Sequence, residues 1–178
     1  MACAILGGTV LTRPGWNVRP AGSLDRALVS LGLLSVGGVL AAVVLKATHV
    51  ALPYNPSELR LMKVAPGMVA LVAAEEFLFR QVMFRWLETH GVSPRLIVGS
   101  TALVFGLAHL GQAFDPSNPL RLFTCFQAAY LILIGCLLGD LRRTSGSWLV
   151  SSMGHLTYNV SLLLTLAIAS PMVAVKVW

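Results

Sequence analysis

VAPGMVALVAAEEFLFRQVMFRW, residues 64–86, is an apolar segment that carries Glu75, Glu76 and Arg80 near its middle. A transmembrane helix needs roughly 20 consecutive apolar residues, and this segment is long enough. Charged groups inside such a helix cost on the order of 2.5–3.5 kcal/mol each by insertion scales, so they are seldom present without a partner or a function. The segment therefore predicts a membrane-spanning helix that contributes to a polar site.

Further apolar runs occur on both sides of this segment. They cover residues 27–52, 95–114, 122–141 and 148–169, and breaks rich in Pro, Gly, Asn and Ser separate them. Hydrophobic residues make up 56% of the chain and charged residues only 11%, whereas soluble domains carry about a quarter charged residues. We expect an all-α, polytopic membrane helix bundle of about five transmembrane helices.

The predicted organisation has four parts. They are an N-terminal tail or interfacial segment (1–22), a first transmembrane helix with its loop (23–63), a four-helix core (64–170) and a C-terminal tail (171–178). Within the core, Gly135 and Gly139 have the GxxxG spacing that permits close helix packing. Arg142 and Arg143 are expected to end the helix that contains these glycines.

The net charge of +6 does not come from a basic cluster. Because Lys and Arg occur singly or in pairs between apolar runs, we expect them to set topology and meet anionic lipid headgroups rather than nucleic acid. With the N-terminus inside, the cytoplasmic segments hold Arg13, Arg19, Arg26, Arg85, Arg95, Arg142 and Arg143. The outer segments hold Lys46, Arg60, Lys63, Arg121 and Lys176. This bias predicts a multi-pass protein with a cytoplasmic N-terminus.

Helical geometry separates the roles of the charged residues in segment 64–86. Glu76 and Arg80 are four residues apart with the acid first, so they share a face and are expected to form an ion pair. Glu75 points about 100° away from Glu76 around the helix. Glu75 is therefore not paired with Arg80 and is expected to face a group on another helix.

Polar residues in the later apolar runs are the candidates for that group. At ~1.5 Å per residue, Glu75, His109 and His155 lie roughly 16, 21 and 11 Å from the inner membrane face. His155 and Asn159 share a helix face because they are four residues apart, and Phe105 lies four residues before His109, where it can pack on the imidazole. We expect one cavity formed by Glu75, His109, His155 and Asn159.

Read in order, these residues form the motifs EExxxR, FxxxH and HxxxN, at Glu75–Arg80, Phe105–His109 and His155–Asn159. This pattern over residues 64–168 resembles the CPBP family of intramembrane proteases, also called the Abi or CAAX-protease-like family, which includes the type II CAAX prenyl endopeptidases. The resemblance implies that Glu75 activates water and that His109 helps to hold that water. It further implies that His155 and Asn159 stabilise the oxyanion, while Glu76 and Arg80 fix the helix and tune the site.

Two mechanisms are compatible with these residues. A metal-free glutamate protease without a cofactor is favoured, because no HExxH motif is present and Asn159 beside His155 suits an oxyanion role. Zinc is the alternative cofactor, with Glu75, His109 and His155 as its ligands.

Two functions also remain open. The first is an intramembrane endopeptidase that hydrolyses a peptide bond of a membrane-associated or lipidated peptide. The second is a non-catalytic family member that acts as a membrane scaffold, accessory subunit or immunity factor and binds other membrane subunits. A transporter is disfavoured because the chain has few helices and no inverted repeat.

Overall fold

The computed structural model describes residues 23–47, 61–114 and 121–169, and every regular element in these ranges is a helix. The elements are α2 (Ser23–Ala47), α3 (Leu61–Glu76), the π-helix η1 (Phe77–Met83), α4 (Phe84–Thr89), α5 (Pro94–Ala108), the 3₁₀-helix η2 (His109–Phe114), α6 (Arg121–Ser145) and α7 (Trp148–Ala169). The predicted all-α membrane helix bundle is confirmed. The expected tails at 1–22 and 171–178 and the breaks at 53–56 and 115–119 lie outside the described residues.

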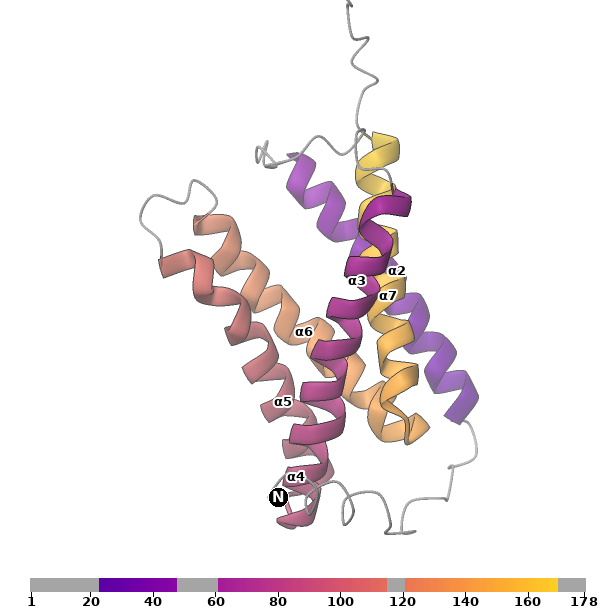
Figure 1. Cartoon of the computed structure of the whole chain (residues 1–178), viewed down its shortest axis with the longest axis vertical. Coiled ribbons are helices and arrows are strands. Elements are labelled where there is room, and N and C mark those ends of the chain that lie inside the picture. The colour runs from indigo at the N-terminus through magenta and orange to yellow at the C-terminus, as the bar shows by residue number, and fades with distance from the viewer. Residues whose placement is uncertain (1–22, 48–60, 115–120, 170–178) are drawn as a thin grey trace, which may run out of the picture.

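The helices form two packed groups that share the rod made by α3, η1 and α4. Helices α5 and α6 pack against each other, and α2 packs on α7. The rod passes between these groups, with α3 in contact with α7 and α4 in contact with α5 (Figure 1). The two groups diverge at the end of the molecule where α3 begins and lie closer together toward α4.

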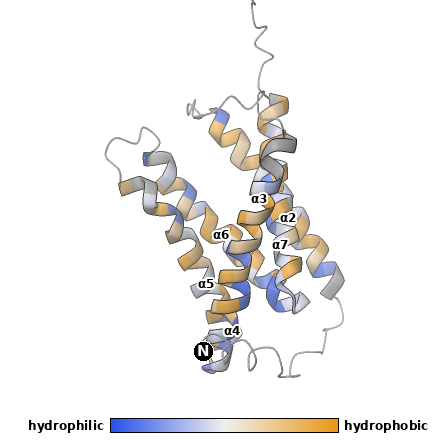
Figure 2. Ribbon diagram, viewed as in Figure 1, coloured by the Kyte–Doolittle hydropathy of each residue, from blue (hydrophilic) through white to orange (hydrophobic). Residues whose placement is uncertain are grey.

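Most helix surface in the described ranges is apolar, as a bilayer environment requires (Figure 2). By length and composition, three segments are suited to cross a membrane: Asp25–Ala47, Pro94–Gly111 and Thr124–Ser145. The expected spans 64–86 and 148–169 are helical but are not among these three. The first is divided among α3, η1 and α4, and the second carries Ser151, His155 and Asn159 within its apolar run.

Glycines allow the helices in both groups to approach closely. A Cβ on Gly135 would lie 2.9 Å from the Cα of Ala102 on α5. A Cβ on Gly38 would lie 2.9 Å from the backbone N of Leu162 on α7. Separations this short leave no room for a methyl group, so the backbones meet directly. The close packing predicted from the GxxxG spacing of α6 is confirmed, since Gly139 also faces Val98 of α5.

Two local expectations were wrong. Segment 64–86 is not one α-helix, because the seven residues of η1 adopt the π-helical form directly after Glu76. His109 begins the 3₁₀ turn η2 instead of lying inside an α-helix. Arg142 and Arg143 lie in the last turn of α6, which ends at Ser145, so the expected end of this helix agrees with the structure to within three residues. Both arginines have partners that make their place in the helix favourable: Arg142 is buried against the rod, and Arg143 pairs with Asp140 at 2.5 Å.

Candidate active site

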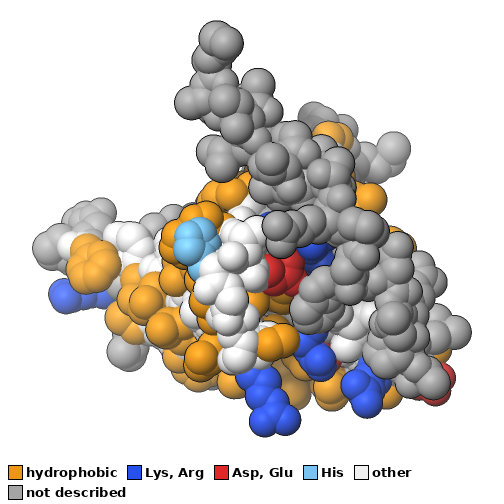
Figure 3. Space-filling model, turned by 90° about the horizontal axis from the view of Figure 1, so that it is seen from below, with side chains coloured by type: hydrophobic (Ala, Val, Ile, Leu, Met, Phe, Trp, Pro, Cys, Tyr) orange, Lys and Arg blue, Asp and Glu red, His pale blue; other side chains and the backbone are white. Residues whose placement is uncertain are grey.

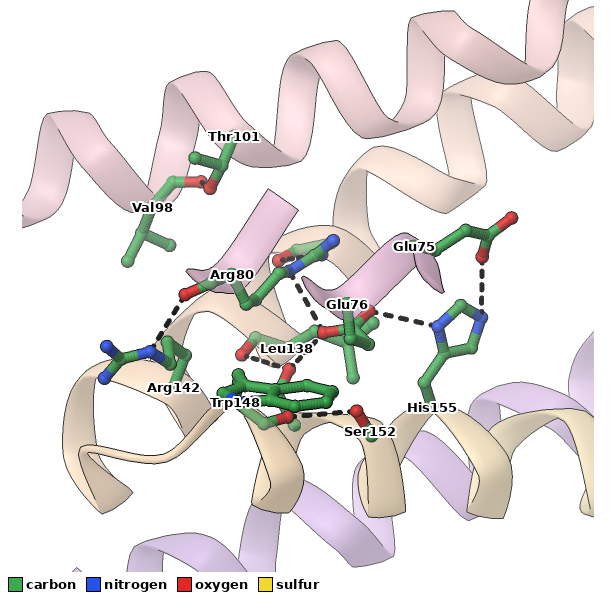
Figure 4. A network of polar contacts seen from close by, with 12 residues as sticks. Glu75, Glu76, Arg80, Val98, Thr101, Leu138, Arg142, Trp148, Ser152 and His155 are labelled. Atoms are coloured by element: carbon green, nitrogen blue, oxygen red, sulfur yellow. Dashed lines mark hydrogen bonds and ion pairs between the residues drawn. The ribbon is translucent and has the colours of Figure 1, made fainter. Parts of the chain in front are cut away.

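Glu76 lies at the centre of the polar contacts of the site, and its side chain is fully buried. Its Oε2 lies 3.4 Å from the Nε of Arg80, one turn further along the rod. From α7, the hydroxyl of Ser151 donates to Oε2 at 2.5 Å, and Nδ1 of His155 lies 3.0 Å from Oε1 (Figure 4). A buried carboxylate needs such partners to offset its desolvation.

His155 lies between the two glutamates. Its Nδ1 faces Glu76, and its Nε2 lies 3.9 Å from Oε2 of Glu75. Figure 4 shows the imidazole reaching from α7 toward both carboxylates. The two acids differ in exposure, since the side chain of Glu75 is 23% exposed and that of Glu76 is fully buried. Only Glu75 of the pair is therefore open to a group from outside the bundle.

Arg80 joins the rod to α5 and α6. Its Nη2 donates to the carbonyl of Gly135 at 3.2 Å, and its guanidinium carbon lies 4.6 Å from the centre of the Phe105 ring. The expected contact between Arg80 and Glu76 is present, and the side chain is fully buried. An arginine in this position has its charge balanced by Glu76 and its plane covered by an aromatic face.

Phe105 connects the two histidines. Its ring centre lies 5.0 Å from that of His109 and 5.6 Å from that of His155, both in edge-on geometry. The packing of Phe105 on His109 is as the sequence predicted. Nδ1 of His109 lies 2.8 Å from the Phe105 carbonyl, and a carbonyl only accepts, so Nδ1 carries the proton of this bond. Nε2 of His109 is then the nitrogen that remains available.

Asn159 lies one turn beyond His155 on α7 and is half-buried. It forms no hydrogen bond with another residue in the described part of the chain. The structure thus brings Glu75, Glu76, Arg80 and His155 into direct contact. His109 is linked to them through Phe105, and Asn159 is linked only through its helix.

Ser151 and Arg142 belong to the site but were not predicted from the sequence. Ser151 is fully buried and contacts both Glu76 and the carbonyl of Leu138. Its position four residues before His155 is a signal for a shared face, which extends the HxxxN motif backward by one turn. Arg142 carries no such signal, because its contact with the Arg80 carbonyl joins segments 62 residues apart.

A protein zinc site needs at least three ligand side chains close together. Across residues 23–47, 61–114 and 121–169, no three His, Cys, Asp or Glu side chains are grouped closely enough to hold a metal. Nδ1 of His155 is engaged by Glu76, and Nδ1 of His109 by a backbone carbonyl. As arranged, Glu75, His109 and His155 do not fit a zinc site, and no step is assigned to a metal.

Comparison with known proteins gives one match. Residues 57–161 match the model of the family described as type II CAAX prenyl endopeptidase Rce1-like. The matched range includes every residue of the three motifs as well as Ser151 and Arg142, and it leaves out α2. No curated protein and no solved structure matches the chain.

Proposed function

The chain belongs to the type II CAAX prenyl endopeptidase Rce1-like family, and from this premise we propose that it is an intramembrane endopeptidase with a glutamate-activated water. The observation that carries the proposal is the pair of unequal carboxylates around His155, of which Glu75 is partly exposed and Glu76 fully buried. Hydrolysis needs a base that water can reach, together with fixed charges that orient its neighbours. Glu75 meets the first need and Glu76 the second.

Glu75 acts as the base in the proposed reaction. Its carboxylate takes a proton from water as the water oxygen attacks the scissile carbonyl carbon. The carbonyl electrons move onto oxygen and form the tetrahedral oxyanion. When the oxyanion collapses, the C–N bond breaks and Glu75 returns the proton to the leaving amine. His109 packs edge-on against Phe105 and has Nε2 available, which supports a role in holding the water.

His155 and Asn159 are the proposed oxyanion donors. As a carboxylate, Glu76 only accepts hydrogen bonds, so Nδ1 of His155 donates to it. This bond fixes the imidazole ring and directs Nε2 toward Glu75 and the space beside it. Nε2, which donates when both ring nitrogens carry a proton, and the side-chain amide of Asn159 are then both directed toward the developing charge. The amide of Asn159 has no hydrogen-bond partner among the residues that the structure describes, which supports this assignment.

The proposed substrate is a peptide held in the membrane by a lipid group, and a prenylated CAAX peptide is the first choice. The surface beside Glu75 favours a lipid group. Leu71, Phe77 and Leu78 flank the two glutamates on the rod and are 61%, 49% and 54% exposed. An isoprenoid chain lying on these side chains would place the adjoining peptide bond near Glu75.

The proposed orientation places the N-terminus and the α4 end of the molecule in the cytoplasm. Seen from the α4 end, arginine and lysine side chains gather along one edge (Figure 3). Arg26 near the start of α2 and Arg95 near the start of α5 are exposed, and Arg143 near the end of α6 is partly exposed. A cytoplasmic surface carries this type of residue. The substrate would then reach Glu75 from the cytoplasmic leaflet.

The full chain, reconstituted in liposomes, tests this proposal. The substrate is a fluorophore-labelled peptide ending in a farnesylated CAAX sequence, and mass spectrometry identifies the products. We expect cleavage by the wild-type protein and none by Glu75→Gln, which keeps the side-chain volume and removes the base. The same peptide without the farnesyl group is expected to be cleaved much more slowly.

Other outcomes would change the assignment. Equal cleavage of the two peptides would reject the lipid-anchored substrate. Cleavage by Glu75→Gln at the wild-type rate would reject the mechanism. A wild-type protein that cleaves neither peptide and purifies in fixed stoichiometry with another membrane protein would favour the accessory-subunit function.

A further inference from the structure

We propose that Arg142, which belongs to none of the three motifs, is a positioning residue for the two glutamates. The inference rests on the proposed function, since it concerns how the catalytic carboxylates are held. Arg142 lies on α6, and its Nε donates to the backbone carbonyl of Arg80 at 2.9 Å. Figure 4 shows this bond on the side of Arg80 opposite Glu76 and His155.

The π-helix explains why that carbonyl needs a partner from outside the rod. The backbone N–H of Phe84 is directed at the carbonyls of Phe79 and Gln81, and the bond to Phe79, five residues earlier, has π-helical spacing. The α-helix resumes at Phe84, and an α-helix takes its acceptors four residues back. The change from five-residue to four-residue spacing passes over one carbonyl. The carbonyl next to that of Phe79 belongs to Arg80, and Arg142 occupies it.

Burial and an aromatic contact hold Arg142 in this position. Its side chain is buried, and its guanidinium carbon lies 5.3 Å from the centre of the Phe84 ring, the first residue after the π-helix. Arg142 therefore contacts the rod on both sides of the change in spacing. A buried carbonyl without a donor costs about 1–3 kcal/mol, so loss of Arg142 favours a return to regular α-helix.

Such a return would displace the carboxylates. One residue of an α-helix corresponds to roughly 100° of rotation, and a π-turn absorbs one residue relative to the regular helix. Without the π-turn, Glu75 and Glu76 would rotate by up to that angle relative to Phe84 at the anchored end. Nδ1 of His155 could not then remain 3.0 Å from Glu76.

Helix α6 holds the site through two further contacts on the same face. The carbonyl of Gly135 accepts from the Arg80 side chain, and the carbonyl of Leu138 lies 3.0 Å from the hydroxyl oxygen of Ser151. Gly135, Leu138 and Arg142 are spaced by three and four residues, which places them on one face. Arg80 and α6 therefore exchange hydrogen bonds in both directions, and Arg142 supplies the one that closes on the rod backbone.

Two substitutions of equal length isolate the hydrogen bond. In Arg142→Gln the side-chain amide nitrogen occupies the position of Nε along the chain, so the donor is kept without the charge. In Arg142→Met a methyl group occupies that position and the donor is lost. Arg143→Met is the matched control, because it removes a neighbouring arginine that pairs with Asp140 at the surface.

We expect Arg142→Met to lower kcat by at least about 10²-fold with KM unchanged, because displacing a catalytic group by only ~1 Å already has that effect. Arg142→Gln should recover most of this loss, and Arg143→Met should match the wild type. Hydrogen exchange at the backbone amides of residues 81–86 gives a readout independent of activity. Exchange at these amides should be faster in Arg142→Met than in the wild type, and it should be unchanged in Arg142→Gln and Arg143→Met.

The outcomes separate this inference from the proposed function. An inactive wild type would reject the proposed function, while the exchange measurement would still report on Arg142. An active wild type with Arg142→Met equal to it in kcat and exchange would overturn only the role of Arg142. If Arg142→Met does not fold, Arg142→Gln decides: retained activity supports the hydrogen bond, and lost activity in a folded protein overturns it.

Discussion

Nδ1 of His155 lies 3.0 Å from Oε1 of Glu76, although the two residues are 79 positions apart and come from different helices. This bond fixes the histidine ring, so that the other ring nitrogen is presented to Glu75 at 3.9 Å. The imidazole is thus held by a buried acid on one side and faces a more exposed acid on the other. In the proposed mechanism, Glu76 orients the ring and Glu75 reacts.

Replacing Glu76 by Gln should affect stability more than Glu75→Gln does. The change leaves Arg80 buried without its counter-charge, and breaking a buried ion pair from one side costs about 3–5 kcal/mol. Thermal unfolding in detergent, followed by circular dichroism, measures the loss. Glu88→Gln is the control, because its pair with Arg85 is partly solvated and is worth less than about 1 kcal/mol. Equal melting temperatures for Glu76→Gln and the control Glu88→Gln would contradict a central role for the Glu76–Arg80 pair.

Asn159→Ala should reduce kcat by roughly 10²–10³, the usual scale for losing an oxyanion donor. Its stability should remain close to that of the wild type, because the side chain makes no hydrogen bond within the described ranges. Steady-state kinetics and a melting curve on the same preparation test both statements. A large fall in melting temperature would show that Asn159 acts in folding, and an unchanged kcat would remove it from the oxyanion site.

Chelation should leave peptide cleavage unchanged. The reason is that Glu75, His109 and His155 are not grouped closely enough in the described part of the chain to ligate one ion. The measurement compares initial rates before and after dialysis against 1,10-phenanthroline, with a zinc peptidase treated in parallel. Activity that disappears on dialysis and returns with added zinc would establish the metal-dependent alternative.

Gly38→Ala should destabilise the bundle, whereas Gly32→Ala on the same helix should not. A methyl group at residue 38 would lie 2.9 Å from the backbone of Leu162, while one at residue 32 meets nothing within 4 Å. Overpacking of this kind typically costs about 1–3 kcal/mol. Melting temperatures of the two variants in the same detergent give the comparison. Equal values would mean that α2 does not pack on α7 as closely as the structure shows.

Much of the local chemistry follows from spacing along the chain. Apolar runs and the shortage of charge predict helices in a membrane, because a helix satisfies its backbone hydrogen bonds within one segment without water. The four-residue interval places Glu76 with Arg80, Phe105 with His109 and His155 with Asn159, whatever surrounds them. These relationships depend only on helix geometry. The observed elements that carry them are all helical: α3 with η1, α5 with η2, and α7.

Contacts between distant segments could not be read in the same way. The spacing of residues within one helix does not place His155 against Glu76 as well as Glu75, or Ser151 against Glu76. These contacts depend on how α7 is rotated about its axis. The rotation is set by packing, including the close approach of α2 at Gly38 and the contacts of α3 with α7.

The π-helix is the clearest case of a feature that tertiary structure decided. Residues 77–83 have the same apolar character as the α-helix before them, and hydropathy does not distinguish the two forms. A π-turn is less favourable locally than an α-turn, so it persists where outside groups satisfy the displaced backbone. Here that group is Arg142, on a helix whose position only the folded bundle determines. The spacing of residues in the sequence determined the helices and the motifs. Helix packing determined the register that directs the two carboxylates toward His155.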